Sequence, residues 1–412
     1  MSFTNTDRIT VSFAGLEMEG VYITKSGDNA VVKLKSGYNI CVPENLCKKR
    51  DIHTVSESKV DVPALKQNAK LPKLSIISTG GTIASTVDYT TGAVSSKFTA
   101  EDILRSIPEL GEIAQYHTLQ PFNTLSENMN TKMWQELART IYEEIKNDSK
   151  GIIVTHGTDT LLYSAAAVSF MVNTPVPIIF VGSQRSADRP SSDNAVNVIC
   201  SAKAGVSELG ETVVCMHSTS SDTSCSLHRA TRVRKNHTSR RDAFRSIGRD
   251  PVGTVSYPDG TVVLAKDAVK RNTHKLELND KMEPNCGLVT YYPGMNPEVL
   301  DAFSGYRGLV ISGTGLGHVG TDCIPKIKNL TDAGTTVVMT SQCQAGCVCD
   351  RVYETGRYLL DAGIIEAGSM LPEVALVKLM WVLGNAKNTA EVKELMQKNL
   401  KGEMDFDIRG EF

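Results

Sequence analysis

The sequence lacks an excess of charge of either sign. Its 44 lysine and arginine residues are balanced by 46 aspartate and glutamate residues, which gives a formal net charge of −2. A net charge this small creates no long-range field that would favour nucleic acid or an anionic membrane. Any contact with RNA therefore has to come from a local patch of the surface.

Long hydrophobic runs are also missing. No stretch reaches the ~18 apolar residues of a membrane-spanning helix, and the N-terminus, MSFTNTDRIT, has no apolar signal-peptide core. We therefore expect a cytoplasmic protein that has no contact with a membrane. The 412 residues, 41% of them hydrophobic, are enough for two or three domains with buried cores.

Two motifs of nucleotide binding are absent or incomplete. The chain has no Gly-x-x-x-x-Gly-Lys-Ser/Thr loop, which argues against binding ATP by that route. The segment Gly315-Leu-Gly317-His-Val-Gly320 fits Gly-x-Gly-x-x-Gly, but no acidic residue ends a strand about 20 residues later, as a dinucleotide site requires. We interpret this segment as a tight turn between a strand and a helix.

The ten cysteines show no complete metal-binding pattern. Cys343, Cys347 and Cys349 lie close together, but no second group of Cys or His has a matching spacing. The other cysteines are scattered in apolar or mixed contexts. We predict reduced, structural thiols and no bound metal.

Residues 1–50 differ from the rest of the chain. The segment EGVYITKSGDNAVVKLKSGYNICV alternates short strands with turn residues and predicts a small β-barrel. This module is either a stabilising appendage or a docking or RNA-contacting module. The basic run Lys48-Lys49-Arg50 at its end is interpreted as solvated surface. The polar residues 51–73 that follow, with two prolines, are typical of a linker.

From residue 74 onward, strand and helix patterns alternate. Near-continuous apolar strands between helices predict a mainly parallel sheet covered on both faces. We expect a large α/β domain over 74–270 and a smaller α/β domain over 285–412. The stretch 218–285 is rich in Arg, Ser and Asp and is predicted to be looser than the rest.

Two apolar strands end in glycine and threonine. They are LSIISTGGTIA at 74–84 and GIIVTHGTDT at 151–160. In a parallel sheet, ligands bind beyond the carboxyl ends of the strands. Glycine leaves backbone N–H groups free to hold an oxyanion, and threonine supplies a hydroxyl. The same pattern also arises where glycine only turns the chain and threonine only caps a helix.

A threonine hydroxyl needs a base before it becomes a good nucleophile. His156 is adjacent, but no Gly-x-Ser-x-Gly elbow accompanies it, so we interpret His156 as a structural residue. The alternative base is a lysine whose pKa is lowered by burial and by neighbouring charge.

At this point the residues resemble a known family. STGGTIAS and THGTDTLLYSAA are similar to the two signatures of the L-asparaginase/glutaminase family. The segments around Ser126–Met129, Gly182–Pro190 and Arg234–Ser239 resemble further parts of its site, and the resemblance spans roughly 74–385.

The resemblance implies specific roles for residues from distant segments. Thr82 is implied as the nucleophile, and Tyr89 as part of a mobile lid. Thr158, Asp159 and Lys235 match a second catalytic set, in which the lysine serves as the base through the threonine hydroxyl and the aspartate holds the α-ammonium of the substrate. The positions implied to grip the α-carboxylate and the α-ammonium are Ser126 and Glu127; many asparaginases have Gln at the latter.

Three features resemble the archaeal tRNA-dependent amidotransferase branch of this family: the N-terminal module, SQRSADRPSSDNAVN and LPEVALVKLMWVLG. This branch implies an ammonia supplier for the conversion of Glu-tRNA(Gln), with glutamine or asparagine as the amide donor. It also implies a homodimer and a GatE-like partner subunit that binds the tRNA and uses ATP and Mg, with no cofactor in this chain. The alternatives are a free-standing L-asparaginase and a non-catalytic binding scaffold.

Overall fold

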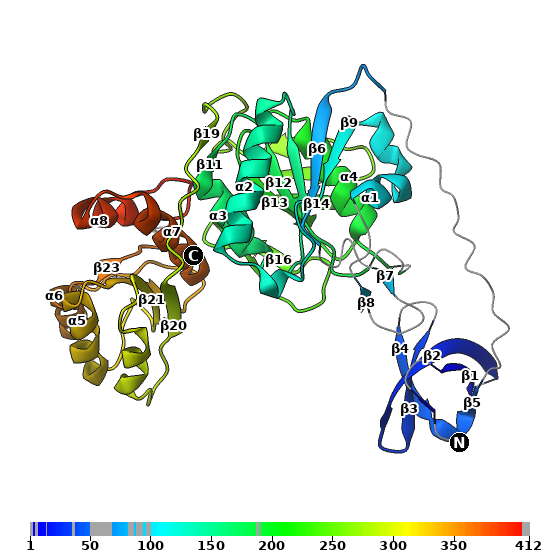
Figure 1. Cartoon of the computed structure of the whole chain (residues 1–412), viewed down its shortest axis with the longest axis horizontal. Coiled ribbons are helices and arrows are strands. Elements are labelled where there is room, and N and C mark those ends of the chain that lie inside the picture. The colour runs from blue at the N-terminus through cyan, green and yellow to red at the C-terminus, as the bar shows by residue number, and fades with distance from the viewer. Residues whose placement is uncertain are drawn as a thin grey trace.

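The computed structural model describes most of the chain (Figure 1). It forms an N-terminal antiparallel sheet followed by two α/β units with mainly parallel sheets, which confirms the predicted fold class. Most of the predicted linker, residues 51–67, lies outside the described residues. The residues described are 3–4, 7–13, 15–34, 38–49, 68–80, 86–87, 94–95, 100–186, 189 and 191–405.

The N-terminal unit, predicted as a small β-barrel, is a curled five-stranded sheet in the order β4-β3-β2-β1-β5 (Figure 1). The expected turn forms at Gly27, where φ is +61°, a conformation that glycine adopts without steric cost. The sequence pattern did not indicate the first and last strands. The strands are β1 Arg8–Phe13, β2 Leu16–Ser26, β3 Asn29–Leu34, β4 Asn39–Pro43 and β5 Cys47–Lys49.

The large α/β unit is built on an eight-stranded sheet in the order β18-β17-β14-β13-β12-β10-β6-β9. The five strands from β9 to β13 are parallel, as their apolar runs predicted, and the three at the other edge are antiparallel. The strands are β6 Lys73–Ser78, β9 Gln115–Leu119, β10 Ile152–Thr155, β12 Ile178–Val181, β13 Thr212–His217, β14 Ser224–Arg229, β17 Gly253–Ser256 and β18 Val262–Leu264.

Helices cover both faces of this sheet, as the absence of polar alternation in its strands predicted. Successive strand residues point to opposite faces, so Ile76 packs in one cluster and Ile77 in another. The helix α2 carries an apolar stripe that recurs every four residues, with Leu137 and Ile141 fully buried. The helices are α1 Ala100–Ser106, α2 Thr131–Lys146, α3 Leu161–Met171 and α4 Asn194–Gly205.

The stretch 218–285 is more regular than predicted. It supplies three strands of the main sheet and further short strands. Its polar residues hide the strand signal because they are buried in matched pairs: His228 bonds Ser246, and Arg229 bonds Glu211. The short paired strands are β7 Thr86–Val87 with β8 Val94–Ser95, β11 Val172–Asn173 with β19 Glu277–Leu278, and β15 Val233–Lys235 with β16 Phe244–Ser246.

The smaller unit is a four-stranded parallel sheet in the order β20-β21-β22-β23. Helices α5 and α6 cover one face, and α7 packs on the other. Its strands are β20 Cys286–Thr290, β21 Gly308–Gly313, β22 Thr336–Ser341 and β23 Ile365–Glu366. Its helices are α5 Ile324–Asp332, α6 Glu354–Asp361, α7 Pro372–Asn385 and α8 Thr389–Gln397. Short 3-10 helices cover Glu44–Leu46, Pro108–Glu112, Ser126–Asn128, Pro297–Phe303 and Thr321–Cys323.

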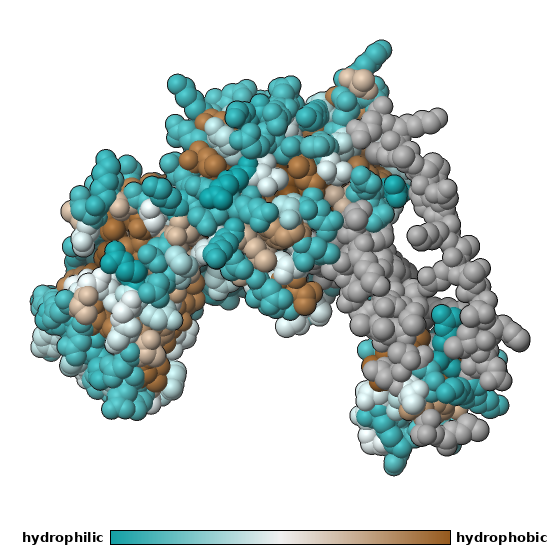
Figure 2. All heavy atoms as spheres, in the orientation of Figure 1, coloured by the Kyte–Doolittle hydropathy of each residue, from teal (hydrophilic) through white to brown (hydrophobic). Residues whose placement is uncertain are grey.

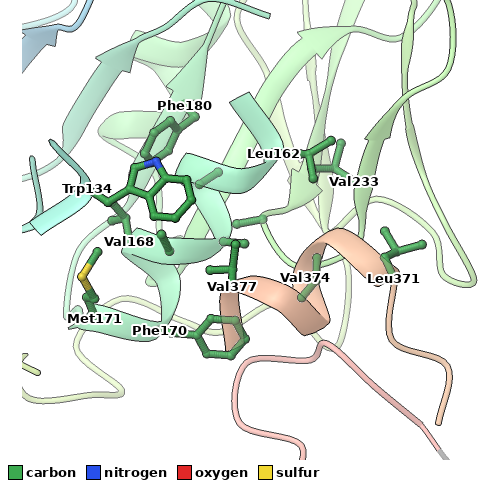
Figure 3. Packing of buried hydrophobic residues seen from close by; sticks show 14 of the residues in the cluster. Trp134, Leu162, Val168, Phe170, Met171, Phe180, Val233, Leu371, Val374 and Val377 are labelled. Carbon is green, nitrogen blue, oxygen red and sulfur yellow. The ribbon is translucent and has the colours of Figure 1, made fainter. Parts of the chain in front are cut away.

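The two α/β units share one hydrophobic core. Helix α3 of the large unit packs against α7 of the smaller one, and the side chains of both helices lie in the same cluster (Figure 3). Val233 of β15 is fully buried in this cluster, which includes Leu162 and Val374 (Figure 3). The position of β15 therefore depends on both units.

Hydrophilic residues cover much of the visible surface of the α/β units, with smaller hydrophobic areas between them (Figure 2). Three of the large apolar side chains that remain exposed lie in or next to α6: Val352, Tyr353 and Tyr358. Among the described residues, no helix combines the length and the apolar character that crossing a membrane requires.

Candidate active site

The two glycine-threonine segments leave neighbouring parallel strands side by side. Strand β6 pairs with β10 so that Ser78 lies opposite Thr155. The backbone N–H and the hydroxyl of Thr79 both donate to the Thr155 carbonyl at 3.0 Å. The two segments therefore begin at the same carboxyl edge of the sheet, although they lie far apart in the sequence.

Glycine is required at two positions, one in the first of these segments and one in the loop after β12 that passes the second. Gly80 has a φ of +106°, and a Cβ atom there would lie 2.5 Å from the Thr124 carbonyl oxygen. Gly182 follows β12, and a Cβ atom there would lie 2.7 Å from Cγ2 of Thr158. Contacts this short exclude any side chain, so glycine at 182 lets the backbone pass directly against Thr158.

Lys235 lies beside the second segment. Its Nζ donates to Oγ1 of Thr158 at 2.9 Å and to Oδ1 of Asp159 at 2.9 Å. The lysine side chain is 11% exposed, whereas that of Asp159 is 72% exposed. An amine, a hydroxyl and a carboxylate from two distant segments thus meet at one point, with the carboxylate open to solvent.

Ser126 lies against the same loop. A Cβ atom at Gly157 would lie 2.7 Å from the Cβ of Ser126, and the Thr160 hydroxyl donates to the Ser126 carbonyl at 2.5 Å. Ser126 is buried and the next residue, Glu127, is exposed. The structure therefore brings Ser126 against the loop that carries Thr158 and Asp159, and Glu127 follows it at the surface. Thr82 and Tyr89, the implied nucleophile and lid residue, lie outside the described residues.

His156 has the properties of a buried structural residue. Its Nδ1 donates to the Gly157 carbonyl at 2.7 Å. Burial lowers the pKa of His156 to about 4, so the ring is neutral near pH 7. The imidazole stabilises the turn that leads from β10 to Thr158.

The two other sequence motifs form no site of this kind. Gly315 and Gly317 have positive φ values, and the turn they make leads into the helix that begins at Ile324, as predicted for the Gly-x-Gly-x-x-Gly segment. All ten cysteines are free thiols. In the described part of the chain, no three His, Cys, Asp or Glu side chains gather as metal ligands would.

Comparisons with known proteins identify the family of the chain. A family model described as asparaginase, N-terminal, matches residues 73–270, and one for the glutaminase/asparaginase C-terminal domain matches residues 285–396. The D subunit of glutamyl-tRNA(Gln) amidotransferase from Methanosarcina barkeri is 50% identical over 418 residues, which cover 98% of this chain and 99% of that protein. The corresponding D subunit from Methanosarcina mazei is 49% identical over 420 residues, which cover 98% and 99%. The chain belongs to this family of asparaginase-like amidotransferase D subunits.

The D-subunit family shares its fold with asparaginases. The thermostable L-asparaginase from Thermococcus kodakarensis superposes with a TM-score of 0.72 at 30% identity, over 81% of this chain and 99% of that one. The D subunits instead match 98% of this chain. Since the asparaginase family model begins at residue 73, the near-complete match to the D subunits extends into the N-terminal sheet.

One residue that the sequence analysis missed organises the loop after β12 in this member of the D-subunit family. Asp193 is fully buried and accepts hydrogen bonds from the Ser183 hydroxyl, from the backbone N–H groups of Gln184 and Arg185, and from the Asn197 amide. It thereby fixes the segment that follows Gly182 and passes Thr158. The only signal in the sequence was the acidic residue within the run SSDN, and this run is also typical of an ordinary helix start.

Proposed function

We propose that this chain hydrolyses the side-chain amide of glutamine or asparagine and supplies the ammonia for converting Glu-tRNA(Gln) to Gln-tRNA(Gln). The observation that carries the proposal is the contact of Lys235 Nζ with both Thr158 and Asp159 at the carboxyl edge of the sheet. The near-complete match to amidotransferase D subunits supports the use of this ammonia for tRNA amidation.

The proposed chemistry begins with the Thr82 hydroxyl, which is two residues beyond Gly80 along the chain. Lys235 takes a proton through the Thr158 hydroxyl, and the Thr82 oxygen attacks the amide carbon. Backbone N–H groups of the glycine-rich turns stabilise the tetrahedral oxyanion. The C–N bond then breaks, the nitrogen takes up the proton and leaves as ammonia, and water hydrolyses the acyl ester on Thr82.

In this scheme the substrate is held by its α-substituents. The carboxylate of Asp159 is exposed and holds the α-ammonium group, while Ser126 lies beside it and binds the α-carboxylate. Glu127 adds a second negative charge for the ammonium group. Tyr89 closes over the bound amino acid.

The second substrate requires a partner. We propose that a GatE-like subunit binds Glu-tRNA(Gln) and activates its γ-carboxylate with ATP and Mg, in the cytoplasm. We expect the partner to make most of the contacts with the tRNA, because the net charge of this chain is small. We also propose a homodimer, because a subunit interface would cover the exposed Val352, Tyr353 and Tyr358.

A free-standing L-asparaginase is the second candidate, because the solved asparaginase matches both α/β units. The N-terminal sheet favours the amidotransferase role. A non-catalytic scaffold is disfavoured, because the contact of Lys235 with Thr158 and Asp159 is intact.

Glutamine-dependent formation of Gln-tRNA(Gln) by the chain with and without the partner subunit separates these functions. We expect the complex to convert Glu-tRNA(Gln) and the complex with Thr158→Val to convert it only when free ammonium is added. Amide hydrolysis by the isolated chain that is fast and unaffected by partner and tRNA would favour the asparaginase. No hydrolysis under any condition would favour the scaffold.

A further inference from the structure

The short strand β15 has two faces with different neighbours. It lies outside the eight-stranded sheet and pairs with β16. Because side chains alternate along an extended strand, Val233 and Lys235 share one face, and Arg234 lies on the other. Lys235, on the first face, bonds Thr158 and Asp159 in the loop between β10 and α3, hereafter the catalytic loop, while Val233 packs in the core that the two α/β units share. Arg234, on the second face, bonds Glu373 of the smaller unit.

Two arginines, Arg234 in the strand and Arg232 directly before it, hold this part of the chain. Arg234 donates through Nε and Nη2 to Oε1 of Glu373, at 3.0 and 2.5 Å. Arg232 is 2% exposed and bonds the Gly402 carbonyl, Ser369 and the Asp405 carboxylate. These contacts connect both residues to the C-terminal part of the chain.

Glu373 also lies near the start of helix α3, which follows the catalytic loop. It is in the first turn of α7, where the free N–H groups of a helix favour an acidic side chain. Burial, and secondly the Glu373 carboxylate, raise the pKa of Tyr163 to about 12. Tyr163 lies in the first turn of α3, four residues after Asp159. The carboxylate of Glu373 thus contacts Arg234, next to the proposed base, and lies near the helix that follows Asp159.

We propose that the Arg234–Glu373 ion pair positions Lys235 relative to Thr158, so that the smaller α/β unit sets the rate of amide hydrolysis. The inference rests on the proposed function for the roles of Lys235 and Thr158. Lysine has a flexible four-carbon side chain, so its Nζ is placed accurately only if its backbone is fixed. Two N–H groups of the planar guanidinium converge on one carboxylate oxygen, and this charge-assisted contact restrains the position of the strand. Arg234 and Glu373 are positioning residues, because neither contacts the reacting groups.

A purely structural ion pair would behave differently from a positioning pair. Loss of a structural pair lowers the free energy of unfolding and leaves the turnover of the folded enzyme unchanged. Loss of a positioning pair lowers kcat at constant KM, because the base moves and the groups that bind the substrate stay in place. The two roles are therefore separable by kinetics on folded protein.

The first test compares Glu373→Gln with Glu211→Gln in the assembled amidotransferase. Glu211 is a matched control because it binds Arg229 at 2.8 Å with similar burial, away from the catalytic loop. We expect Glu373→Gln to lower kcat by about tenfold to 10²-fold, the scale of a displaced catalytic group, and to leave KM unchanged. Glu211→Gln keeps the wild-type kcat. Arg234→Lys should retain more of the kcat than Arg234→Gln, because lysine keeps the positive charge that pairs with Glu373.

A second test needs no activity. The amine of Lys235 is labelled with acetic anhydride, and the rate is read by peptide mass spectrometry relative to the exposed Lys328. We expect Glu373→Gln to raise the rate at Lys235 by about threefold or more, because the local restraint is lost, whereas Glu211→Gln leaves it unchanged. If wild-type protein releases no ammonia, the proposed function fails, and the labelling still decides the positioning. Unchanged labelling in Glu373→Gln would overturn the inference.

Discussion

A buried ion pair holds the C-terminal segment in place and gives a direct test of the packing. Lys378 and Glu403 are both fully buried, with 2.6 Å between Nζ and Oε1. Glu403 also accepts hydrogen bonds from the backbone N–H groups of Leu400 and Lys401. The segment they fix contains Gly402, whose carbonyl binds Arg232 near the proposed base.

Glu403→Gln is the informative change, because it keeps the size of the side chain and removes its charge. Glutamine has one accepting oxygen, so a backbone N–H group loses its partner or the ammonium of Lys378 keeps only the Met396 and Lys398 carbonyls, without a counter-charge. Breaking a buried pair in this way costs about 3–5 kcal/mol of the free energy of unfolding. Urea unfolding followed by tryptophan fluorescence measures this change, since Trp381 lies in the same helix as Lys378.

The matched control is Asp332→Asn, which breaks the exposed pair between Lys328 and Asp332 and should cost at most about 0.5 kcal/mol. The double variant Lys378→Met with Glu403→Gln leaves no uncompensated charge. It should be more stable than the sum of the two single changes by about 2 kcal/mol. A cost below about 1 kcal/mol for Glu403→Gln, or strict additivity in the double variant, would refute the reasoning.

Four further outcomes are expected. Thr158→Val and Lys235→Met each lower the rate of ammonia release from glutamine or asparagine by at least about 10²-fold, the usual contribution of general acid–base catalysis. A smaller loss would exclude these two residues as the proton path. Gly182→Ala destabilises the fold by about 1–3 kcal/mol by overpacking and reduces turnover, because its Cβ would lie 2.7 Å from Cγ2 of Thr158. Wild-type stability in urea unfolding together with a wild-type rate of ammonia release would contradict the contact. The pKa of His156 is lowered in the folded state to about 4, so the unfolded chain binds a proton that the folded chain does not. Stability therefore falls as the pH decreases from 6.5 towards 4. His156→Gln should weaken this dependence, which is measured as the midpoint of urea unfolding at a series of pH values. Burial raises the pKa of Asp350 to about 7, so the folded state binds the proton and stability falls as the pH rises from 4 to 7. Asp350→Asn should flatten this slope of stability against pH. An unchanged slope would argue against burial of the carboxyl group.

Much of the parallel framework could be predicted from the sequence, because its strands carry the signal of burial on both faces. LSIIS and GIIVT are almost uniformly apolar, and each forms a strand that ends at the site. Strand β14, by contrast, has the sequence SCSLHR. Its His and Arg are buried, but their partners lie 18 residues away in the sequence, so local hydropathy cannot reveal the strand.

The site could be predicted only in part for the same reason. The glycine-threonine segments were evident because two of them follow apolar strands, whereas a single one would be explained by a turn and a helix cap. Lys235 lies in a run of arginines, and nothing local distinguishes it from a solvated base; the family resemblance singled it out. Arg234 and Glu373 are 139 positions apart. Their pairing depends on how the two α/β units dock, which no local pattern in the sequence encodes.

The most direct test of the proposed mechanism is to trap the acyl intermediate. Protein is mixed with glutamine, quenched in acid and digested, and the peptides that contain Thr82 and Thr158 are examined by mass spectrometry. We predict a γ-glutamyl ester on Thr82 in the wild type and none in Thr82→Ala or Lys235→Met. An ester on any other residue, or ammonia release that continues in Thr82→Ala, would contradict the mechanism.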